Sequence, residues 1–126
     1  MPKIIDFNSE VSCLELFRSD NRTATGNGSG VDTLGYEGKL KITLDIGTVT
    51  GTTPTLDVKI QDSADNSTFA DLSPAVAFAQ QNAAGINHLG LDIRTVRRYV
   101  RAVATLGGTS PNFNFAVLAY GQKQTL

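Results

Sequence analysis

The chain has 126 residues, enough for a single domain that buries roughly two-thirds of the surface exposed by its unfolded form. Eleven Lys and Arg against 12 Asp and Glu give a net charge of −1, which argues against a dedicated nucleic-acid binder with a strongly basic face. One Cys and one His exclude an internal disulfide and a zinc cluster, so the fold must depend on its hydrophobic core.

The composition favours an all-β domain. Twelve Gly, frequent Thr, Val and Ile, and polar turn clusters at intervals of about ten residues are typical of a β-sandwich. The N-terminus lacks the apolar run of a signal peptide, and no later stretch is long enough to cross a bilayer. We therefore expect synthesis in a cytoplasm and no membrane partner.

The first residues are the least regular. Residues 1–10 show no clean period, and an arm that orders only on another subunit is one interpretation. Residues 11–18 favour a strand, although Ser9 could cap a short helix there. We expect residues 1–19 to be an N-terminal arm or first strand, and residues 20–126 to form the sandwich domain.

A glycine-rich stretch follows at residues 25–30, with the sequence Thr-Gly-Asn-Gly-Ser-Gly. Glycines let backbone N–H groups approach a phosphate, but a phosphate loop also needs a preceding strand, a Lys-Ser or Lys-Thr and a following helix. Here Val31-Asp32-Thr33-Leu34 follows the glycines instead. We predict a mobile surface loop.

Two stretches repeat one pattern. Apolar residues alternate through 40–46 and again through 56–60, and the same arrangement returns at 100–106 and 113–117. Each pair is separated by Gly-Thr-x-Pro, which is typical of a turn. We predict two similar β-hairpins whose apolar faces meet in the core.

The polar residues between and after these stretches suggest little chemistry. Asp62, Asp65 and Asp71 could attract calcium, but their spacing lacks the glycine and closing glutamate of a calcium-binding loop, and turn residues explain them as well. Alternation predicts strands at 75–81 and 85–93, with His88 on the face opposite Leu89. His88 has no recognisable nucleophile or carboxylate partner, so we predict no enzyme, no metal site and no cofactor.

The densest positive cluster contains the first candidate interface. In an extended chain Arg97, Tyr99 and Arg101 share one face, and such residues are enriched at the centres of protein interfaces. A solvated sheet face is the alternative. The last predicted strand carries the second candidate, because Ala116, Leu118 and Tyr120 make its outer face apolar as well as its inner one.

The repeated stretches also resemble small structural proteins of tailed bacteriophages, the decoration or cement proteins of the head. The resemblance spans roughly residues 20–121, and the segments that carry it are Tyr36–Leu40, Thr50–Ser63, Arg98–Thr105 and Gly107–Pro111.

This resemblance implies a jelly-roll-like antiparallel β-sandwich with about eight strands. It also implies a homo-oligomer, a dimer or trimer, that binds the outer surface of the capsid and bridges copies of the major capsid protein. Localisation on the exterior of the virion follows. Phage tail and baseplate proteins use similar sandwiches, so a tail part remains an alternative. A module that binds host glycans is another, although the chain has no Trp on which to stack a sugar.

Overall fold

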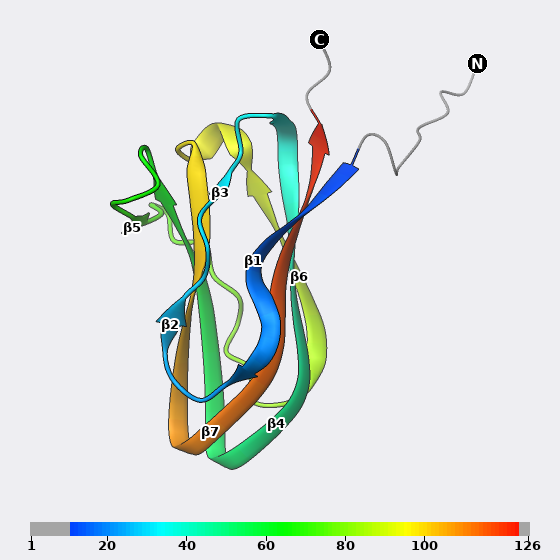
Figure 1. Cartoon of the computed structure of the whole chain (residues 1–126), viewed down its shortest axis with the longest axis vertical. Coiled ribbons are helices and arrows are strands. Elements are labelled where there is room, and N and C mark those ends of the chain that lie inside the picture. The colour runs from blue at the N-terminus through cyan, green and yellow to red at the C-terminus, as the bar shows by residue number, and fades with distance from the viewer. Residues whose placement is uncertain (1–10, 124–126) are drawn as a thin grey trace, which may run out of the picture.

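The computed structural model describes residues 11–123, which form an antiparallel all-β fold without an α-helix in that range. Its elements appear in Figure 1 and are, in chain order, β1 (Val11–Arg22), β2 (Gly26–Asn27), β3 (Val31–Asp32), β4 (Tyr36–Ser63), β5 (Ala70–Asp71), β6 (Gly85–Asp92), a short 3-10 helix η1 (Ile93–Thr95) and β7 (Tyr99–Lys123). None of the helical structure within residues 11–123 could span a membrane. The prediction of an all-β sandwich is confirmed.

The two long strands β4 and β7 form the frame of the fold. They pair with each other from Tyr36 opposite Lys123 to Ser63 opposite Tyr99. Residues 40–46 pair with β6 and with the second half of β7, whereas residues 56–60 pair with the first half of β7. The prediction of two hairpins is therefore wrong: β4 and β7 form one antiparallel ribbon that bends over on itself.

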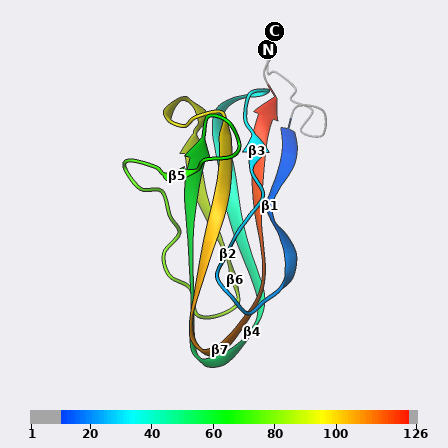
Figure 2. The ribbon, with the colours of Figure 1, turned by 60° about the vertical axis from the view of Figure 1, so that its left-hand side comes forward.

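The repeated Gly-Thr-x-Pro segments make the bend. Gly51 and Gly108 have φ angles of +118° and +98°, which side chains with a Cβ rarely adopt. In Figure 1 both strands turn over at the lower end of the molecule, and Figure 2 shows the two resulting layers side by side. A folded antiparallel ribbon of this kind is the basis of a jelly-roll-like sandwich.

The core lies between the two layers. The alternating residues predicted to point inward do so, because Leu44, Val58 and Phe115 are each at most 1% exposed. The same cluster contains the other inward residues of both layers, Leu40, Ile42, Ile46, Leu56, Ile60, Val100, Ala102, Ala104, Phe113, Val117 and Ala119. The period of two thus identified the buried face of each half-strand correctly.

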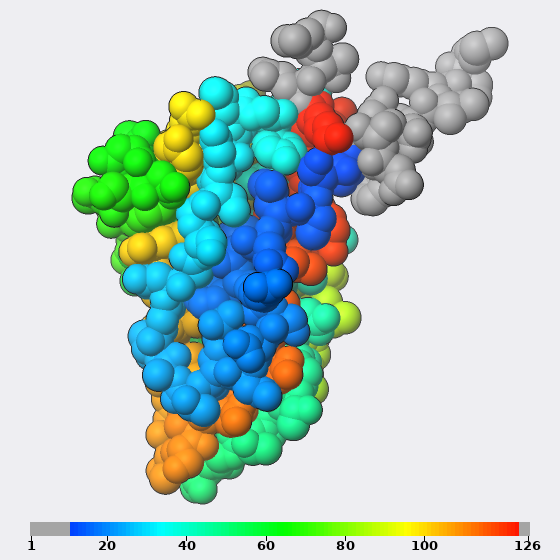
Figure 3. Space-filling model, in the orientation of Figure 1, coloured from blue at the N-terminus to red at the C-terminus, as the bar shows by residue number. Residues whose placement is uncertain are grey.

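Shorter elements complete the layers. β1 pairs with the second half of β7, while β2 and β3 pair with its first half. The segment from β1 to β3 therefore closes one side of the sandwich, and it covers much of the face seen in Figure 3. On the opposite side Leu72 and Phe78 bury their side chains in the core.

Two local predictions need correction. Residues 25–30 are not wholly a loop: Gly26–Asn27 pairs with β7, and Ser29 donates its backbone N–H to the carbonyl of Leu16. A Cβ on Gly28 would collide with that same carbonyl oxygen, so the glycine permits a close approach of two backbones. Residues 75–81 form isolated bridges to β4 instead of a continuous strand, whereas the strand predicted at 85–93 is present as β6.

At its start, the described chain lies within the sheet. Residues 11–19 belong to β1, whose register with β7 begins at Val11 opposite Gln122. The arm considered for residues 1–10 lies outside the described residues.

Candidate protein-binding surfaces

One layer of the sandwich presents a hollow on its outer surface. Its strands lie in the order β1, β7, β4 and β6. Across this layer Tyr120 stands between Cys13 of β1 and Lys41 of β4, and Leu118 stands between Glu15 and Thr43. Because residues 40, 42 and 44 face the core, Lys41 and Thr43 face outward with their β7 neighbours.

We call this hollow the outer groove. It has a volume of about 600 Å³, and its lining consists of Val11, Lys41, Thr43, Asp45, Ile86, His88, Leu118, Tyr120, Gly121 and Gln122. Leu118 and Tyr120 of β7 lie on one side of it and Ile86 and His88 of β6 on the other, with Lys41, Thr43 and Asp45 of β4 between them. Such a combination is typical of a surface that binds a partner.

The second candidate interface predicted from the sequence falls on this surface. Leu118 and Tyr120 line the outer groove, and both are half-buried. Ala116 lies on the same outward face, opposite Asp45, next to the groove lining. All three predicted residues are therefore brought together on one layer.

Tyr120 is held as a neutral phenol. The electrostatic interaction with Cys13 is the largest cause that raises the pKa of Tyr120 above its ordinary value, followed by partial burial, the hydrogen bond with Cys13 and the charge of Asp45. A neutral phenol offers the groove both a flat apolar ring and one polar group, which suits a binding surface.

Sequence reasoning did not identify the β6 side of the outer groove. Ile86 is 62% exposed, one of two large apolar side chains in the described chain that are so exposed. Beside it, His88 Nδ1 and Thr43 Oγ1 lie 2.9 Å apart in a hydrogen bond. The alternation in β6 places Ile86 and His88 on one face, but only the pairing with β4 shows that this face lies across β4 from Leu118 and Tyr120.

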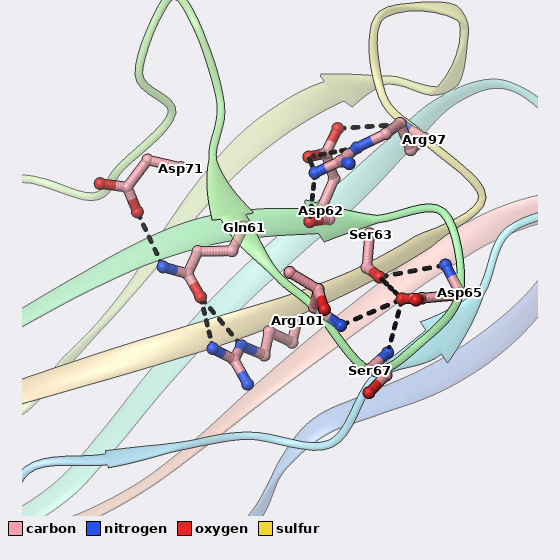
Figure 4. A network of polar contacts seen from close by, with 9 residues as sticks. Gln61, Asp62, Ser63, Asp65, Ser67, Asp71, Arg97 and Arg101 are labelled. Carbon is pink, nitrogen blue, oxygen red and sulfur yellow. Dashed lines mark hydrogen bonds and ion pairs between the residues drawn. The ribbon is translucent and has the colours of Figure 1, made fainter.

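The first candidate interface has a different character. The guanidinium of Arg101 donates two hydrogen bonds, of 2.9 and 2.7 Å, to Oε1 of Gln61, and it lies 4.3 Å from the ring centroid of Phe69. Gln61 in turn donates to Asp71, which also pairs with Lys59. Figure 4 shows Arg101 and Gln61 within this network. Arg101 is thus engaged within the chain.

Arg97 lies before β7 and is directed at the buried carboxylate of Asp62. Its side chain pairs with Asp62 at 2.9 Å, and its backbone N–H donates to the other carboxylate oxygen at 2.9 Å (Figure 4). Burial raises the pKa of Asp62, but the bonds from Arg97 outweigh it and leave the pKa below its ordinary value. Tyr99 and Arg101 are alternate residues of β7 and share a face, whereas Arg97 lies before the strand and is turned toward Asp62.

The rest of the arginine cluster is also paired. Arg98 binds Asp32 at 2.7 Å, and Arg94 binds Asp92 at 3.0 Å. The bond from Arg98 is the largest cause that lowers the pKa of Asp32. The positive charges that looked available in the sequence are therefore largely matched by acidic groups of the same chain.

The aspartates considered for calcium serve three separate structural roles. Asp62 binds Arg97 and Asp71 binds Lys59. Asp65 accepts bonds from the backbone N–H groups of Thr68 and Ser67 and from the hydroxyl of Ser63, and these lower its pKa to about 2, with the Thr68 bond as the largest cause. Within residues 11–123, no group of three or more potential metal-binding side chains comes together.

Comparison with known proteins gives a likeness in fold. No family model and no curated protein matches this sequence. Among solved structures, the crystal structure of the SPBc2 prophage-derived protein YomS is similar with a TM-score of 0.55 and 9% sequence identity, over 89% of this chain and 94% of that one. At this identity the likeness shows a shared fold alone.

Proposed function

We propose that this chain is a structural protein of a tailed phage, and that it decorates the outer surface of the head by binding the major capsid protein. The observation that carries the binding role is the outer groove, where Ile86 is exposed across β4 from Leu118 and Tyr120. Exposed apolar side chains are costly to leave in water, so their burial against a partner is favourable.

The phage setting has two supports. The sequence segments around the ribbon bend resemble head decoration proteins, and the fold is shared with a prophage-derived protein along most of both chains. A binding role also agrees with the side-chain chemistry of the arginine cluster, since Arg94, Arg97 and Arg98 are each paired with an aspartate of the same chain.

Decoration can stabilise a shell without strong individual contacts. A protein that binds only the assembled state stabilises each site by about 2.7 kcal/mol when its free concentration is a hundredfold above Kd. If the chain forms a dimer or trimer, as the resemblance implies, each bound copy raises the effective concentration of its neighbours. Weak binding at each groove, repeated over a shell, is therefore sufficient to stabilise it.

The experiment measures binding of the purified protein to expanded and unexpanded head shells of the phage that encodes it. We expect binding to expanded shells, and we expect Ile86→Asp to weaken it by at least about tenfold. Leu34→Asp is a matched control, because Leu34 is 63% exposed against 62% for Ile86 but lies outside the outer groove.

The copy number of the protein in purified particles distinguishes a head protein from a tail protein. In purified particles the protein should be present at a copy number near that of the major capsid protein. A few copies per particle would identify a tail or baseplate component, and absence of binding to any shell would overturn the proposal.

A further inference from the structure

One edge strand of the sandwich is unprotected. β6 is the outermost strand of its layer, and among residues 11–123 it pairs only with β4, residue by residue from Gly85 to Asp92 and without a bulge. Every second residue of such a strand points its backbone N–H and C=O groups away from the sheet. β6 contains no Lys, Arg, Glu or Pro, although charged residues and proline are the usual means of preventing edge pairing. Its outer edge is therefore suited to accept another strand.

The opposite edge of the same layer is protected. The register of β1 with β7 is irregular between Glu15 and Phe17 and again between Phe17 and Asp20, and such bulges discourage further pairing. Ser29 also donates its backbone N–H to the carbonyl of Leu16, so the segment before β3 covers part of this edge. The second layer is bordered by β2, β3 and β5, which have two residues each. Among the described strands, β6 alone presents a long open edge.

The outer face of β6 is complementary to itself. Ile86, His88 and Gly90 are alternate residues and share this face. In an antiparallel pair of two β6 strands centred on His88, Ile86 of each copy lies opposite Gly90 of the other. Ile86 is 62% exposed, and a Cβ on Gly90 would meet only the Lys39 side chain among the described residues, 3.9 Å away. The space above Gly90 is therefore open to receive the apolar side chain.

We propose that β6 pairs with β6 of a second copy, antiparallel and about a two-fold axis at His88, so that the free protein is a dimer. The two edge strands then become central strands of one continuous layer, and each Ile86 is covered by the other copy. A two-fold interface uses the same patch on both copies, so no β6 edge is left and association stops at two. This favours the dimer over the trimer that the resemblance also allows.

Both outer grooves face the same side of this dimer, because pairing of like faces requires a two-fold axis perpendicular to the layer. One consequence rests on the proposed function: two grooves on one side let a dimer contact a shell at two points, which raises the effective concentration for the second contact. The pairing itself is measured without shells. A monomer that binds shells would overturn the pairing alone, and a dimer that binds no shell would overturn the decoration proposal alone.

Sedimentation velocity over a range of protein concentrations tests the dimer. We expect twice the mass of the chain for the wild type. Gly90→Lys should weaken dimerisation by at least about tenfold, because it places a charged side chain opposite Ile86 of the second copy. Gly35→Lys is the matched control, since a Cβ there meets no atom within 4 Å and Gly35 lies outside β6. Circular dichroism verifies that both variants fold. A monomeric wild type, or equal dimerisation of the two variants, would overturn the proposal.

Disulfide trapping tests the register. In a Cys13→Ser background, His88→Cys places two thiols at the two-fold axis, where Cα atoms of paired residues are about 4.5–5.5 Å apart and within reach of a disulfide. Mild oxidation should give a crosslinked dimer at least about tenfold faster than for Leu34→Cys, at an exposed position outside β6. Equal rates for these two variants, or faster trapping of Leu89→Cys than of His88→Cys, would overturn pairing centred on His88.

Discussion

Gly51 and Ser110 meet at the bend of the β4–β7 ribbon: a Cβ on Gly51 would lie 2.7 Å from the carbonyl oxygen of Ser110. The relationship is reciprocal, since a Cβ on Gly108 would lie 2.5 Å from the carbonyl oxygen of Thr53. The two copies of Gly-Thr-x-Pro therefore pack against each other, and each glycine leaves room for the other copy's backbone.

Gly51→Ala should destabilise the fold at this bend. The φ angle of +118° alone costs a residue with a Cβ about 1–3 kcal/mol, and the contact with Ser110 adds to this. Urea unfolding measures the loss. Gly85→Ala is the control, because a Cβ there meets no atom within 4 Å. Equal stability of the two variants would show that the bend tolerates a side chain.

The bend also explains why the prediction of two hairpins was wrong. Gly-Thr-x-Pro correctly indicates a change of chain direction, because glycine conformations and proline positions are local properties. Which strands become neighbours is decided by pairing between β4 and β7, whose partners Tyr36 and Lys123 are far apart in the chain. A local turn signal cannot separate a hairpin from a folded ribbon.

The candidate site shows the same difference between local properties, which the sequence displays, and long-range pairing, which it does not. Alternation placed Leu118 and Tyr120 on an outer apolar face, as the structure has them. It could not show that Ile86 lies across the same groove, nor that Arg97 is bound to Asp62, 35 residues away in the sequence. Both relations depend on long-range pairing, which a single sequence does not display.

Leu44→Ala should cost about 2–5 kcal/mol of unfolding free energy, because it removes a side chain that is 0% exposed and leaves a cavity in the core. The denaturant midpoint is the measurement. Leu34→Ala serves for comparison, since Leu34 is 63% exposed and its truncation should change stability little. Leu44→Asp should prevent folding altogether, as a buried unpaired charge cannot be accommodated.

Asp62→Asn should remove a pH-dependent contribution to stability. The pKa of Asp62 is lowered on folding, because the bonds from Arg97 outweigh burial, so the stabilisation is present above the unfolded value near 3.8 and is lost as the pH falls through the folded value. At pH 7 the loss should be about 1.5–3 kcal/mol, the range for hydrogen bonds to charged groups.

Unfolding in urea at pH 7 and at several values below 4 tests this expectation. The difference between wild type and Asp62→Asn should shrink as the pH falls. Asp20→Asn is a suitable control, because Asp20 is exposed and bonds only its neighbour Asn21 among the described residues. A difference that stays constant with pH would mean that the Asp62 charge does not stabilise the fold.

Comparison of Arg101→Glu with Ile86→Asp decides between the two surfaces proposed from the sequence. The guanidinium of Arg101 is already bound to Gln61 and stacked on Phe69, so its reversal should leave the chain folded and change shell binding little. Ile86→Asp places a charge in the outer groove and should weaken binding by at least about tenfold, or 1.4 kcal/mol. Titration of each folded variant against expanded shells is the measurement. A larger loss of binding for Arg101→Glu would move the docking surface to the opposite layer, where Arg101, Gln61 and Asp71 form their network.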